Sequence, residues 1–252
     1  MKAIVPGLTA CLAVMLCLGC DSSSTDPDDG VPNQLGGETA LELTQVGQQF
    51  DVWLDVDAGL EGSMQDSVMI TRSEGGLVTF RTSIRADSAY IASLDSALGT
   101  TDLPRAAKLA IVDSYLKKYG ATIDTGDWND ARLNFELKLR ITSEGIQEYV
   151  SSAGDLRKPQ TVVRYGASVG DVNRFTDAEG VVVTRTVVQK SVDDDYDIGF
   201  WRIKVITVEQ RKEDPLIEKI TYIANHKFGL VAVGLTTKTG REVRLGIWPP
   251  TL

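Results

Sequence analysis

One stretch of the chain, residues 131–141, alternates strictly between apolar and polar side chains. The apolar positions are Leu133, Phe135, Leu137, Leu139 and Ile141. Successive side chains of a β-strand point to opposite faces of a sheet, so this pattern predicts a strand with one buried face and one solvated face. One-sided burial is typical of antiparallel sheets, because helices cover both faces of parallel ones.

Glycine-containing turns separate further short runs of the same kind. They fall at residues 73–76, 177–180 and 238–240, each between two runs rich in β-branched residues. Glycine supplies the positive φ that a tight hairpin needs. About 10–12 strands result when every short run bounded by turn residues is counted. The sequence therefore predicts a mainly β (α+β) protein with a large curved antiparallel sheet, a half-barrel or open barrel.

Residues 87–120 depart from the two-residue period. Ile91, Leu94 and Leu98 recur at spacings of three and four, which predicts a helix at about 87–98. A broader apolar arc after the N-cap candidate Asp102 predicts a second helix at about 103–119. We expect this helical pair to be inserted into the β domain, with the second helix lying on the sheet.

Few residues offer catalytic or metal-binding chemistry. His226 is the one histidine, and all three cysteines precede residue 21. A site with several histidines is therefore impossible, and a serine triad would lack its usual sequence context. Residues 193–197 resemble the start of a calcium loop, but Ile198 and Lys204 stand where the loop needs glycine and glutamate. The sequence predicts a non-enzyme without a cofactor or metal.

The net negative charge argues against two classes of partner, namely nucleic acid and anionic lipid. The formal net charge is −9, and no run of lysines and arginines interrupts the acidic character. An acidic surface repels phosphate backbones and anionic lipid headgroups. We therefore expect no nucleic acid partner. We also expect no direct adsorption of the acidic protein surface to anionic lipid, so attachment to a membrane requires a separate anchor.

The first residues carry a targeting signal. Lys2 precedes an apolar run at residues 8–18, which is shorter than the roughly 20 residues that a helix needs to cross a bilayer. A basic start, a short apolar region and small residues after it are typical of a secretory signal peptide. We predict a signal peptide at residues 1–19.

The end of this signal resembles the lipobox of bacterial lipoproteins, read as Cys17-Leu18-Gly19-Cys20. The resemblance implies cleavage before Cys20 and a lipid on that cysteine. An aliphatic residue is usual where Cys17 stands. The localisation implied is the cell envelope, with the domain outside the cytoplasm and anchored to a bacterial membrane.

The domain prediction follows from these features. Residues 20–37 are rich in Ser, Asp, Gly and Pro and predict a lipidated flexible tether. Residues 38–252 form the β-rich domain, and a further boundary near 151–158 stays open.

Two functions fit a domain of this kind. Its predicted architecture is loosely similar to the half-barrel lipoproteins of the LolA and LppX type, and this resemblance implies an apolar or lipid-like ligand between sheet and helix. The ligand-binding residues expected are Tyr115, Leu116, Leu137 and Trp201. The alternative is a structural lipoprotein that docks an envelope protein and has no pocket.

Overall fold

The computed structural model describes residues 31, 33–56, 66–87, 104, 107, 122–124, 130–199, 201–215 and 217–248. Within this part of the chain the fold is almost entirely β, as predicted, with one short 3₁₀ turn, η1 (Glu42–Thr44), before the first strand. Thirteen strands form one sheet, and every pairing in it is antiparallel.

The first half of the sheet follows the chain from the sheet's centre to one end. Its strands lie side by side in the order β1 (Gln49–Val56), β2 (Asp66–Glu74), β3 (Leu77–Asp87), β5 (Asp130–Thr142), β6 (Gly145–Glu148) and β7 (Gln160–Arg164). The short strand β4 (Thr122–Asp124) pairs with the beginning of β5.

The second half runs from the other end of the sheet back to its centre. Its strands lie in the order β8 (Val172–Thr176), β9 (Val182–Lys190), β12 (Ile206–Lys212), β13 (Ile217–Asn225), β14 (Gly229–Thr237) and β15 (Glu242–Trp248). The hairpin of β10 (Tyr196–Asp197) and β11 (Arg202–Ile203) stands apart from this sheet. A ladder between β1 and β15 joins the two halves.

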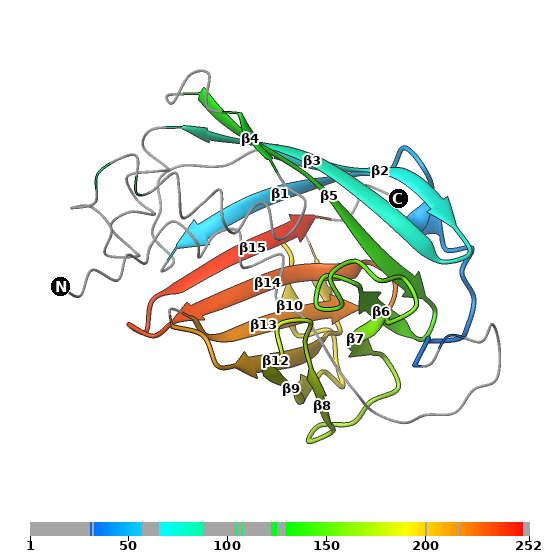
Figure 1. Ribbon diagram of the computed structural model, residues 1–252. Helices are drawn as coiled ribbons and strands as arrows, with labels where there is room; N and C mark the ends of the chain where they lie inside the picture. The colour runs from blue at the N-terminus through cyan, green and yellow to red at the C-terminus, as the bar shows by residue number, and fades with distance from the viewer. Residues whose placement is uncertain are drawn as a thin grey trace.

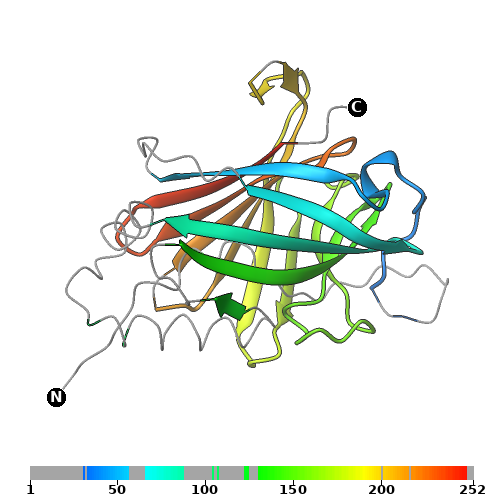
Figure 2. The same ribbon diagram turned by 90° about the horizontal axis from the view of Figure 1, so that it is seen from above.

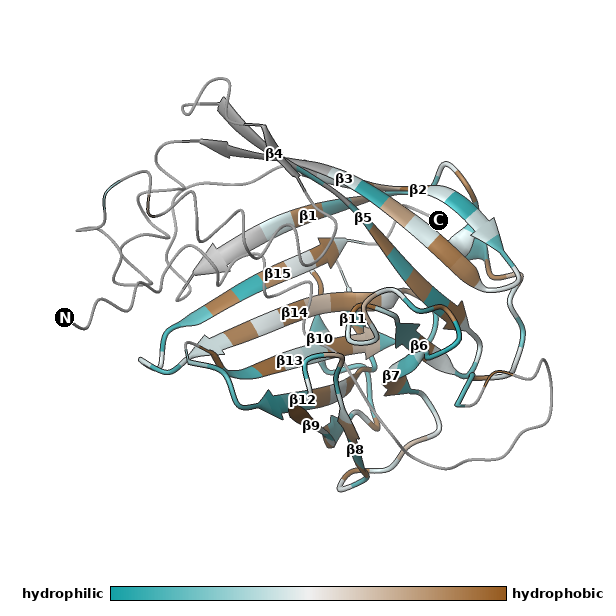
Figure 3. Ribbon diagram, in the orientation of Figure 1, coloured by the Kyte–Doolittle hydropathy of each residue, from teal (hydrophilic) through white to brown (hydrophobic). Residues whose placement is uncertain are grey.

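The sheet curves until its halves face each other (Figures 1 and 2). The strands at its two ends, β7 and β8, do not pair, so the sheet is an open barrel. Apolar residues alternate with polar ones along the strands (Figure 3), and the apolar side chains meet between the halves. The prediction of a large curved antiparallel sheet is therefore confirmed.

The strand at residues 131–141 is confirmed as β5. Leu137 and Leu139 lie on the interior side of the sheet. Glu136, which precedes Leu137, and Lys138, which lies between the two leucines, are exposed. The three predicted turns also connect neighbouring strands, β2 to β3, β8 to β9 and β14 to β15. These features depend on short stretches of sequence, which explains why the pattern was sufficient to predict them.

The two predicted helices fall almost wholly outside the described residues. Asp87, the expected first residue of the helix at 87–98, instead ends strand β3. Between there and strand β4 only Pro104 and Ala107 are described, and the amide of Ala107 donates to the carbonyl oxygen of Pro104 at 2.9 Å.

The tether prediction at 20–37 is wrong for its last residues. Leu35 is 1% exposed, and its amide donates to the side-chain oxygen of Gln147 in β6 at 2.8 Å. The side-chain nitrogen of Gln147 in turn donates to the carbonyl oxygen of Asn33 at 2.7 Å. Burial of one leucine and satisfaction of a buried glutamine hold this segment against β6, despite its polar composition.

The segment at 151–158 is a connection between two neighbouring strands, β6 and β7, of the same sheet. The change from the first half of the sheet to the second lies later, at residues 165–171 between β7 and β8.

Candidate ligand-binding cavity

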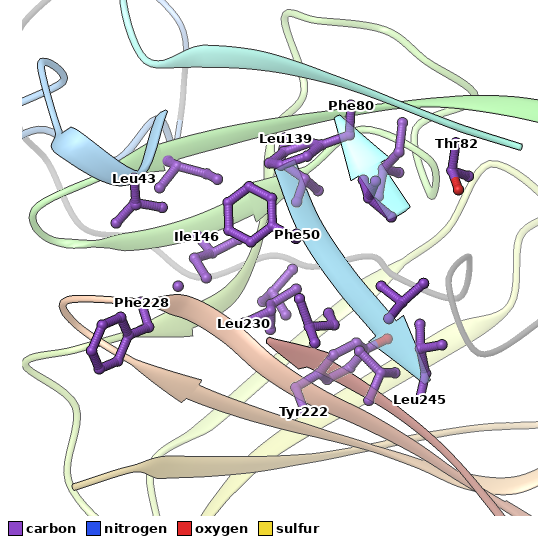
Figure 4. A pocket seen from close by; sticks show the side chains of 18 residues that line it. Leu43, Phe50, Phe80, Thr82, Leu139, Ile146, Tyr222, Phe228, Leu230 and Leu245 are labelled. Atoms are coloured by element: carbon purple, nitrogen blue, oxygen red, sulfur yellow. The ribbon is translucent and has the colours of Figure 1, made fainter. Parts of the chain in front are cut away.

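An apolar cavity of about 90 Å³ lies between the two halves of the sheet. The first half contributes one wall, with side chains that alternate along its strands and point inward: Phe50 and Val52 from β1, Val68 from β2, Phe80 from β3 and Leu139 from β5. The rings of Phe50 and Phe80 pack edge to face, with centroids 6.0 Å apart (Figure 4). The period of two thus places residues that are two apart, such as Phe50 and Val52, on the same wall of the cavity.

The second half supplies the opposite wall. Its contributions come from the three strands nearest the junction: Tyr222 from β13, Leu230 and Val233 from β14, and Leu245 and Ile247 from β15. Ile146 from β6 and Val162 from β7 also line the cavity. Figure 4 shows that Leu43 of η1 and Phe228 lie toward one end of the cavity, away from Leu245.

The lining is poor in polar groups. Among the described residues around the cavity, only Thr82 and Tyr222 have polar side chains, and none is charged. The Thr82 hydroxyl donates to the carbonyl oxygen of Ser67 at 3.3 Å. Such a lining suits a ligand held by burial of apolar surface.

A buried polar cluster connects the two ends of the sheet beside the cavity. The side chain of Arg185 in β9 is 2% exposed and forms an ion pair with the fully buried carboxylate of Glu148 in β6 at 3.4 Å. Its guanidinium also donates to the side-chain oxygen of Gln210 in β12 at 2.9 Å and to the carbonyl oxygen of Thr161 in β7. Side chains thus bridge β6 and β7 to β9 where no strand ladder does.

Burial has a marked effect on the acid of this cluster. Loss of hydration raises the pKa of Glu148 from its ordinary value of 4.5 to about 7. The positive charge of Arg185 and hydrogen bonds from the backbone of Ser151 and Val150 oppose this increase without cancelling it. The amide of Ser151 donates to the Glu148 carboxylate at 3.1 Å.

The four predicted ligand-binding residues lie in different places. Leu137 lines the cavity. Trp201 does not: it precedes β11 in the separate hairpin, and 49% of its surface is exposed. Tyr115 and Leu116 lie outside the described residues.

Most of the cavity lining was not named from the sequence. Phe50 and Val52 lie two residues apart in the sequence, as the inward face of a strand requires, but this spacing does not indicate which distant strand lies opposite. Ile203 and Val205 show the same limit, because they are buried in a different cluster with Ile198 and Val231. Alternation predicts that a side chain is buried, whereas the long-range pairing decides where.

Two further features are absent from the described residues. No helix in this part of the chain is long and apolar enough to cross a membrane. No group of three or more histidine, cysteine, aspartate or glutamate residues among them is placed to hold a metal ion.

Comparison with known proteins gives remote structural similarity only. No family model and no curated protein matches the sequence. A Bacteroides fragilis protein assigned as exported, with a YmcC-like fold, aligns over 83% of this chain and 97% of its own, with 8% identity and a TM-score of 0.41. A Parabacteroides distasonis protein assigned as a lipoprotein aligns over 84% and 98%, with 5% identity and a TM-score of 0.40. Similarity this low carries no conclusion about function.

Proposed function

We propose that this protein is a non-catalytic envelope lipoprotein that binds an apolar or lipid-like ligand between the two halves of its sheet. The observation that carries the proposal is the cavity itself, with its apolar walls and absence of charged groups among the described residues. Well-packed interiors contain few voids larger than a water molecule, so an apolar space of this size has to be explained. Room for a ligand explains it.

The proposal is tested by the mass of the protein purified from a bacterial envelope, measured under native and denaturing conditions. We expect extra native mass that is lost on denaturation and corresponds to an apolar molecule. A protein that shows its bare covalent mass under both conditions contradicts ligand binding and favours docking to an envelope protein.

Filling the cavity should displace the ligand. The variant Leu137→Trp places a larger side chain on the cavity wall, and we expect the ligand-bound fraction in the native mass spectrum to fall about tenfold, because overpacking a site costs on the order of 1–3 kcal/mol. The matched control is Lys138→Trp, one residue along the same strand, where the side chain is exposed. Equal occupancy in the two variants would place the ligand elsewhere on the protein.

The anchor is tested separately at the cysteines. Acyl chains hold a protein at a membrane by burying methylene groups, and the lipobox-like sequence assigns these chains to Cys20. In cells fed radioactive palmitate, we expect Cys20→Ser to remove all label from the protein. Cys17→Ser should retain the label, since that position precedes the cleavage. Label retained by Cys20→Ser would refute the proposed anchor.

A further inference from the structure

The chemistry of the cavity wall restricts which part of a ligand can enter. A carboxylate, phosphate or sugar inside would lose its water, and burial without compensating hydrogen bonds is costly. The hydroxyl of Thr82 already donates to the carbonyl oxygen of Ser67, so this donor is not available to a ligand. The guanidinium of Arg185 lies 5.8 Å from the centre of the Tyr222 ring and is not part of the cavity lining. The part of the ligand that enters is therefore hydrocarbon.

The size of the cavity restricts the ligand further. An engineered apolar cavity of about 150 Å³ in another protein accommodates benzene. The cavity between the sheet halves has about 90 Å³. A fused ring system, or two acyl chains side by side, would force the two halves apart.

The shape of the walls also disfavours a flat ligand. The planes of the Phe50 and Phe80 rings meet at 61°, so these two rings do not form a parallel pair that could hold an aromatic ligand between them. The remaining walls consist mainly of leucine, isoleucine and valine. In Figure 4 the lining extends from Leu43 and Phe228 at one end to Thr82 and Leu245 at the other. A space lined by aliphatic side chains on several sides matches an alkyl chain.

We propose that the cavity takes the end of one unbranched alkyl chain, while the headgroup of that ligand stays outside. The inference rests on the proposed function, because it specifies the ligand class of the same cavity. A free fatty acid and a single-chain phospholipid present the same alkyl chain and would both fit.

The test compares two alcohols that each have ten carbons and one hydroxyl group, 1-decanol and 1-adamantanol. The protein is the mature chain, residues 20–252 with Cys20→Ser, which keeps every described residue and carries no lipid. Titration calorimetry should show 1-decanol binding about tenfold or more tightly than the compact 1-adamantanol, because overpacking penalises the bulkier shape. Along the series of unbranched alcohols, affinity should rise about fourfold with each methylene group that enters the cavity and level off once the cavity is full.

The outcomes separate the inference from the proposed function. Binding of 1-adamantanol as tightly as 1-decanol would overturn the alkyl-chain inference and leave an apolar ligand in place. Failure of both alcohols to bind would overturn both proposals. Leu137→Trp should weaken 1-decanol binding, and Lys138→Trp should not.

The natural source of the chain is identified by the mass that the envelope-purified protein releases on denaturation. A fatty acid or a single-chain phospholipid would each support the inference and would differ by the mass of the headgroup. Release of a diacyl phospholipid would overturn it, because two chains exceed the space available.

Discussion

Replacement of Arg185 with alanine is expected to lower the free energy of unfolding by about 3–5 kcal/mol at pH 8, the cost typical of removing one partner of a buried ion pair. The loss would leave the carboxylate of Glu148 buried without a counter-charge. It would also remove the donors to the Gln210 side chain and the Thr161 carbonyl group. Urea unfolding followed by circular dichroism measures the change.

Two further variants make the Arg185 experiment specific. The double variant Arg185→Met with Glu148→Leu should recover part of the loss, because apolar residues of similar volume often replace a buried pair without penalty. The exposed Arg157, which pairs with Asp155, is the control, and Arg157→Ala should change stability little. If Arg185→Ala were as mild as Arg157→Ala, the buried pair would not hold the sheet ends together.

The second large effect is a pH dependence of stability that originates at Glu148. In the folded protein its pKa is raised to about 7, whereas the unfolded chain has the ordinary value of 4.5. Between these two values the folded state keeps a proton that the unfolded state has lost, so the free energy of unfolding should decrease as the pH rises. The interval corresponds to roughly 3 kcal/mol, fully present below pH 4.5 and lost as the pH passes 7.

Glu148→Gln isolates this contribution, because glutamine keeps the shape of the side chain and does not titrate. We expect the difference in stability between the natural protein and this variant to change across pH 5–8 in urea unfolding experiments. A difference that stays constant over this range would mean that the carboxyl group is ionised throughout. Arg185→Ala should also be less damaging at pH 5 than at pH 8, because a protonated Glu148 needs no counter-charge.

The sequence contains a signal for this cluster. Along β9, Val183, Arg185 and Val187 occupy successive positions of one face, and all three are buried. An arginine on the apolar parity of a strand indicates a buried charge, and such a charge requires a partner. The pattern does not indicate which partner, since Glu148 lies 37 residues earlier in the chain.

Features that depend on neighbouring residues could be predicted from the sequence, whereas features that depend on long-range strand pairing could not. The inward face of β5 and the three hairpin turns depend on neighbouring residues, so the alternation and the glycines were sufficient. The position of Leu137 in the cavity depends in addition on the opposite wall, which comes from strands of the other half. Composition also failed at residues 33–37, where burial of Leu35 outweighs the polar character of its neighbours.

Formation of the ladder between β1 and β15 determines when the sheet can be complete. Asp51 lies opposite Trp248 and Val56 opposite Val243, so the centre of the sheet joins strands from near the two ends of the described chain. Each half of the sheet is a series of neighbouring strands and can assemble from local pairings, whereas the central ladder must close a loop that includes both halves. During synthesis, the cavity cannot exist until β15 has emerged, because Leu245 and Ile247 belong to its wall. A ligand of the proposed kind could therefore bind only after almost the whole described chain has been made.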